Sequence, residues 1–198
     1  MQSRVGIRVR LCLGFLAPGA AMALGAREAG AQGGTVSAAQ VISLAATKTS
    51  QLTITIGSGA VQSLPSLTDN AVNSFPTPVV ITTSWDLNPG QTNTVNLMAY
   101  FTTPAQALSG GATQIPSSRV LGRMTTGLPV AFTAITQNAV GGIGTAGGSL
   151  RLFAQNISGP NKKANRTDNL DLQIDLVGFP TLSPGLYSGT LNLQAVTQ

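Results

Sequence analysis

Apolar and polar residues alternate along most of the chain, in short runs separated by turn-forming residues. Alternation with a period of two is typical of a strand with one buried face and one solvent-facing face. The clearest run is 170–176, in which leucine or isoleucine occupies every second position. Similar runs lie at 52–56, 79–85, 94–101, 130–134, 150–154 and 187–195. These seven runs predict seven half-buried strands.

Turn clusters such as Asn88-Pro89-Gly90 and Ser183-Pro184-Gly185 separate the runs. Many short strands with turns between them favour an all-β fold over alternating β and α units. We therefore predict an antiparallel, immunoglobulin-like (Greek-key) β-sandwich over residues 51–198. Residues 32–50 are expected to be an N-terminal extension or to contain a first strand, since 38–46 fits a helix or a strand at 40–44 equally well.

The alternation also identifies the residues that face the core. The single tryptophan lies on the inward face of an early run, where it is expected to fill the core rather than to form a ligand platform. The predicted core contains Trp85, Leu97, Phe101, Phe132, Leu152, Leu172, Ile174, Tyr187, Leu191 and Leu193.

Residues 1–31 have the order of a secretory signal peptide: arginines first, then an apolar stretch, then small residues. The predicted cleavage site consists of Ala29, Ala31 and Gln32. A transmembrane anchor is the alternative, but Pro18, Gly19 and Gly25 interrupt an apolar stretch that needs about 20 residues. We expect a secreted, periplasmic or cell-surface protein that is not stably inserted in a membrane after cleavage.

Removing this leader changes the charge and the cysteine content. Seven basic residues remain against five aspartates, a net charge of +2, and they form no basic stripe interleaved with aromatic residues. Nucleic acid is therefore not an expected partner. The only cysteine, Cys12, lies within the leader, so the mature chain is expected to lack a disulfide, a thiol nucleophile and a thiolate metal site.

Residues 142–147 match the Gly-x-Gly-x-x-Gly pattern of dinucleotide-binding loops. That motif needs a preceding strand and a following helix whose N-terminus meets the pyrophosphate. Here the residues that follow, 149–155, alternate like a strand. We interpret the segment as a connection between two strands and expect no cofactor.

Catalytic chemistry has few candidates in this sequence. The absence of histidine excludes a Ser-His-Asp triad and imidazole metal ligands. Asp171 and Asp175 share a strand face, but roughly 13–14 Å separates positions four residues apart on a strand. The segment 161–169 holds one aspartate and three cations, so we expect a hydrogen-bonded turn rather than a calcium site. The protein is not expected to be an enzyme.

A family resemblance is confined to the C-terminal region. A Pro-Gly turn at 184–185, Tyr187, Gly189-Thr190 and an alternating strand follow one another there. This stretch of about 20 residues resembles the last strand of bacterial secreted immunoglobulin-like domains of the spore-coat-U and fimbrial subunit type. The resemblance implies a Greek-key sandwich exported for surface or filament structure. The disulfide common near the N-terminus of that family has no counterpart here.

Two functions follow as expectations. The first is a structural or adhesive cell-surface subunit, similar to a fimbrial subunit. The second is an extracellular module that binds carbohydrate or another ligand, although few aromatic residues are available for a binding platform. A structural subunit is expected to self-associate through its terminal strands, because 187–197 lacks the charge or proline that normally protects an edge strand. Residues 33–49 either pair within their own domain or donate a strand to another copy.

Overall fold

Apolar and β-branched residues at alternate positions build the strands, as in β3 (Val79–Asp86), where buried and half-buried side chains alternate. The computed structural model describes residues 45–88, 94–110 and 113–198. The predicted leader, with its cleavage site at Ala29, Ala31 and Gln32, lies outside the described residues. The candidate first strand at 40–44 also lies outside them.

The other strands are short, apart from one long central strand. They are β1 (Gln51–Ser58), β2 (Val72–Ser74), β4 (Thr94–Tyr100), β5 (Leu108–Gly110), β6 (Thr113–Ile115), β7 (Val120–Met124), β8 (Thr133–Ala134), β9 (Ser149–Asn156), β10 (Lys163–Asp175) and β11 (Asn192–Thr197). Two 3-10 helices, η1 (Pro104–Gln106) and η2 (Ser117–Arg119), are the helical elements of the described ranges. The all-β prediction is confirmed.

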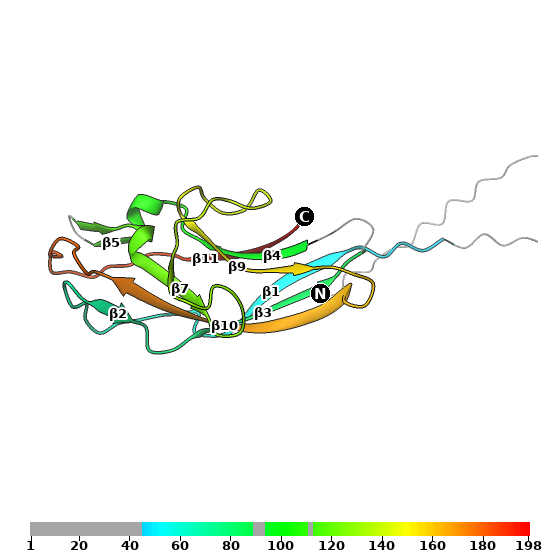
Figure 1. Cartoon of the computed structure of the whole chain (residues 1–198), viewed down its shortest axis with the longest axis horizontal. Helices are drawn as coiled ribbons and strands as arrows, with labels where there is room; N and C mark the ends of the chain where they lie inside the picture. The colour runs from blue at the N-terminus through cyan, green and yellow to red at the C-terminus, as the bar shows by residue number, and fades with distance from the viewer. Residues whose placement is uncertain (1–44, 89–93, 111–112) are drawn as a thin grey trace, which may run out of the picture. The chain divides into compact units, whose positions relative to one another are not determined.

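The strands form two main sheets in which every pairing is antiparallel. The first sheet has the order β1-β3-β10-β7-β8, with β2 also paired to β10, and the second has the order β11-β4-β9. β5 and β6 form a separate two-stranded sheet. Figure 1 shows β4, β9 and β11 in one layer and β1, β3 and β10 in the other.

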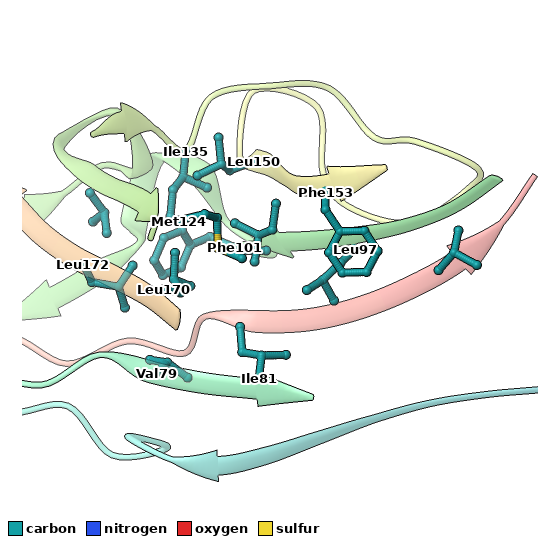
Figure 2. Packing of buried hydrophobic residues seen from close by; sticks show 14 of the residues in the cluster. Val79, Ile81, Leu97, Phe101, Met124, Ile135, Leu150, Phe153, Leu170 and Leu172 are labelled. Carbon is teal, nitrogen blue, oxygen red and sulfur yellow. The ribbon is translucent and has the colours of Figure 1, made fainter. Parts of the chain in front are cut away.

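One hydrophobic core lies between the two main sheets. Figure 2 shows Val79 and Ile81 of β3 on one side, with Leu97 and Phe153 of the second sheet on the other. Because side chains alternate between faces, a shift of one residue in either sheet would turn this apolar set toward solvent. Burial of the core therefore fixes the register of both sheets.

The predicted core residues fall into two groups. Those that the structure buries are Trp85, Leu97, Phe101, Leu152, Leu172 and Ile174. Those that it leaves half-buried are Phe132, Tyr187, Leu191 and Leu193. Phe132 lies under the Arg123 guanidinium, 4.5 Å from its ring centroid, and so packs against a charged side chain rather than within the core.

The polar half of β10 corrects the prediction of a turn at 161–169. From Lys163 onward these residues pair with β3 as a regular strand. The inward positions there hold Arg166 and Asp168, which bond to each other and show no apolar alternation. An ion pair has replaced the apolar residues by which this half of the strand would have been recognised.

Two other predicted strands are shorter in the structure. The run 187–195 becomes a strand only at β11, and 130–134 contributes only the two residues of β8. Strands β2, β5, β6 and β7 were not expected. Three of them have only three residues, too few to show a period, and Gly122 and Arg123 interrupt the pattern in β7.

Candidate functional site

The glycine-rich segment forms a tight turn between strands. Val140 and Ile143 exchange two backbone hydrogen bonds, with N–O distances of 2.9 and 3.1 Å. Between them, Gly141 and Gly142 have φ angles of 60° and 82°, which glycine adopts at little steric cost. The segment leads directly into β9. Since a strand follows, the loop offers no helix N-terminus to a pyrophosphate.

This loop packs against the outer face of the second sheet. It enters β9 at one edge of that sheet, and a side chain at Gly141 would meet Val196 and Gln198 at the other edge. The Nδ2 of Asn96 donates to Oε1 of Gln198 over 3.2 Å. Asn96 and Met98, which face outward from β4, are both buried. The loop therefore has a packing role.

A buried ion pair occupies the inward face of β10. Asp168 is 1% exposed, and both its oxygens accept hydrogen bonds from the Arg166 guanidinium, at 2.5 and 2.6 Å. The hydroxyl of Thr126 donates a third bond at 2.8 Å. The same guanidinium lies 4.4 Å from the ring centroid of Phe153, which belongs to the opposite sheet. These contacts satisfy the carboxylate fully and tie the two sheets together.

The other aspartates also have structural partners. Lys48 donates to Asp86 over 2.6 Å, and this hydrogen bond holds the pKa of the Asp86 carboxyl below its usual value. Arg123 pairs with Asp171 over 2.7 Å. The two remaining carboxylates, Asp69 and Asp175, accept backbone N–H groups. In the described part of the chain, no group of three or more His, Cys, Asp or Glu residues is placed to hold a metal ion.

A cavity of about 850 Å³, which we call the groove, opens between the two main sheets. Core residues line it from both sides: Val79, Leu170 and Leu172 from the first sheet, Leu193 from the second, and Phe101, which directly follows β4. Cavities of this size are within the range of roughly 300–1,000 Å³ that is usual for ligand sites. The groove thus reaches the hydrophobic core, although Val79, Leu170, Leu172 and Phe101 are themselves buried.

Two segments without regular secondary structure form the walls of the groove: residues 59–67, which follow β1, and residues 182–191, which precede β11. Within the described ranges, 60–67 makes no backbone–backbone hydrogen bond. The other wall makes two, both between Ser188 and Ser109. Side chains occupy three more backbone groups of the walls: the carbonyls of Gly59 and Ser183 and the N–H of Leu182. Most of the others could pair with an extended segment placed between the walls.

One exposed leucine borders the groove. Leu186 lines the groove and is 85% exposed, whereas Val61 of the segment 59–67, which is 88% exposed, is not among the lining residues. Single exposed aliphatic residues are common, but Leu186 borders a groove that core residues line.

The groove explains the half-buried state of three predicted core residues, since Tyr187, Leu191 and Leu193 all line it. Trp85 is not among the lining residues, and its indole nitrogen donates to the backbone oxygen of Asn161 over 2.8 Å. Sequence reasoning did not identify the wall at 59–67. The signal there is limited to three large apolar residues, Val61, Leu64 and Leu67, within a stretch of turn-forming residues.

Comparisons with protein-family models, with curated proteins and with solved structures found no match. No helix among the described residues is long and apolar enough to cross a membrane.

Proposed function

We propose that this protein is an exported, non-catalytic β-sandwich that serves as a structural or adhesive subunit at the cell surface. Its leader-like N-terminus supports export, and the two facing antiparallel sheets are compatible with an immunoglobulin-like, Greek-key arrangement. The structural pairing of its aspartates supports a role without catalysis. The function would then lie in contacts between copies.

The observation that carries this proposal is the open groove between walls with unpaired backbone. Adding an extended segment there would supply hydrogen-bond partners to the walls and pack against the apolar residues that line the groove. Residues 33–49 contain a segment with a partial period of two: Val36, Ala38, Ile42 and Leu44 occupy positions of one parity, with Gln40 between them, while Ser37 and Ser43 occupy the other parity together with Ala39 and Val41. Placed in the groove as a strand, this segment would direct its apolar face toward the core.

A neighbouring copy is the better source of this segment than the same copy. Residues 45–50 lead into the Gln51 end of β1, whereas the groove lies at its Ser58 end. The intervening eight residues span about 27 Å at the usual strand rise. A segment that filled its own groove would have to run back over this length, whereas one from another copy could enter directly. Repetition of this contact would link copies head to tail.

Sedimentation velocity of the full chain and of a chain lacking residues 33–44 tests the proposal. This deletion spares Lys48 and its bond to Asp86. We expect the full chain to self-associate and the deleted chain to remain folded as a monomer. A deleted chain that unfolds would show that the segment belongs to its own domain, and a full chain that stays monomeric would refute self-association.

Two point variants give a matched comparison within the segment. Leu44→Asp places a charge on the strand face that carries Ile42 and would point toward the core. Ser43→Asp places the same charge on the opposite face. We expect Leu44→Asp to reduce self-association strongly and Ser43→Asp to reduce it little. Equal effects of the two variants would contradict insertion as a strand.

A ligand-binding module is the second candidate, favoured by the volume of the groove and by the aromatic residues Phe75, Phe101 and Tyr187 in its lining. The ligand would be a carbohydrate or a small apolar molecule. A monomeric full chain that binds such a molecule, and loses binding on Tyr187→Ala, would favour this candidate over the structural one.

A further inference from the structure

The β5–β6 sheet supports one wall of the groove. Ser109 of β5 exchanges two backbone hydrogen bonds with Ser188, at 2.9 and 3.1 Å. A Cβ atom added to Gly189 would meet the carbonyl oxygen of Ala107, which shows how closely the wall approaches this region. The wall at 182–191 is therefore held by its contact with the segment 107–110, in addition to the bonds of Leu182 N–H with Asp69 and of the Ser183 hydroxyl with Thr113.

The ring of Tyr187 lies directly against the backbone of Gly110. A Cβ atom at Gly110 would lie 2.7 Å from Cδ1 of the ring and 2.8 Å from the carbonyl oxygen of Leu186. Only a residue without a side chain permits this approach. The hydroxyl of Tyr187 donates to the carbonyl oxygen of Ser183 over 2.8 Å, so that the ring is held at both ends.

We propose that the contact between Tyr187 and Gly110 sets the width of the groove and thereby determines whether a strand can be accommodated in it. This inference rests on the proposed function. Tyr187 lines the groove, and the wall on either side of it has few other hydrogen bonds to the domain. The position of the ring therefore decides how far this wall stands from residues 59–67. Gly110, which does not line the groove, acts on the incoming segment through the wall, whereas Tyr187 both positions the wall and lines the groove.

Two substitutions disturb this contact in different ways. Gly110→Ala places a methyl group where the ring and the Leu186 carbonyl lie, and so displaces the wall. Tyr187→Ala removes the ring, so that the wall is no longer held against β5. Each change alters the spacing between the walls without removing a fully buried side chain, since Tyr187 is half-buried.

The matched controls leave the groove untouched. Gly159→Ala adds the same methyl group at a glycine with no atom within 4 Å of the added carbon. Tyr100→Ala removes a tyrosine whose hydroxyl donates to Gln194 on the second sheet, and Tyr100 does not line the groove. Both controls are expected to self-associate as the full chain does.

The test measures the dissociation constant of self-association of the full chain by sedimentation velocity, with thermal unfolding recorded for each variant. We expect Gly110→Ala and Tyr187→Ala to weaken association at least tenfold relative to their controls while keeping a cooperative unfolding transition. If Gly110→Ala does not fold, Tyr187→Ala alone decides the result. Unchanged dissociation constants in folded variants would overturn the positioning role.

The experiments distinguish a failure of the positioning role from a failure of the proposed function. If deletion of residues 33–44 abolishes association and the folded wall variants associate normally, strand addition stands and the positioning role is wrong. If the full chain is monomeric, the proposed function and this inference fail together.

Discussion

At the scale of single residues, the main departure from the sequence prediction is the ion pair of Arg166 and Asp168 on an inward strand face. Burying charged groups is costly unless they are paired and hydrogen-bonded. Here the carboxylate receives three hydrogen bonds, and the guanidinium covers an aromatic ring of the opposite sheet. The pair thus contributes to the connection between the sheets.

Removal of this carboxylate should therefore destabilise the fold. Asp168→Ala leaves the Arg166 charge without its partner, and we expect a loss of about 3 kcal/mol in the free energy of unfolding, the lower end for a broken buried pair because Arg166 keeps some solvent access. The control is Asp171→Ala, which breaks the more exposed pair with Arg123 and should cost at most about 1 kcal/mol. Urea titration measures both, and equal losses would contradict the structural role of Asp168.

The pair of Lys48 and Asp86 makes a prediction about pH. Because the hydrogen bond from Lys48 lowers the pKa of Asp86 in the folded state, its stabilising contribution is present above the unfolded pKa. It is lost as the pH falls through the folded pKa. We expect Lys48→Met to raise the pKa of Asp86 toward its usual value of 3.8, as measured by NMR titration of the carboxyl carbon. An unchanged pKa would show that Lys48 does not make this bond in solution.

At the scale of elements, the Gly-x-Gly-x-x-Gly motif is compatible both with a dinucleotide-binding loop and with a turn between strands. The strand that follows it here decides for the turn. Gly142 and Gly159 both have no atom within 4 Å of an added Cβ, but only Gly142 has a positive φ, of 82°. Gly142→Ala should therefore cost about 1–2 kcal/mol from backbone strain alone. Gly159→Ala isolates that effect and should be close to neutral. Thermal unfolding distinguishes the two, and similar stabilities would contradict the strained turn.

The sequence was informative where alternation is carried by apolar side chains, as in β3, β4, β9 and the second half of β10. The sequence did not predict a strand where another interaction replaces the burial of apolar side chains or where the strand is very short. The first half of β10 is held by an ion pair, and β2, β5 and β6 are too short to show a period. The groove was beyond sequence reasoning, because its two walls have no regular secondary structure and therefore no hydrophobic period to read.

At the scale of the whole molecule, the open groove predicts that stability depends on protein concentration. If a segment from another copy fills the groove, association stabilises the folded state by mass action. A tenfold rise in concentration well above the dissociation constant should then add about 1.4 kcal/mol. For a domain of this size, that corresponds to an increase of roughly 3–6 °C in the melting temperature.

The chain that lacks residues 33–44 provides the control for this prediction. Its groove has no segment to receive, so its melting temperature should be lower than that of the full chain and independent of concentration. Differential scanning calorimetry over a hundredfold range of concentration measures both chains. A full chain whose melting temperature does not change over this range would show that the groove is not filled by a second copy. Equal melting temperatures for the two chains at every concentration would show further that residues 33–44 make no stabilising contact with the domain, either within one copy or between copies.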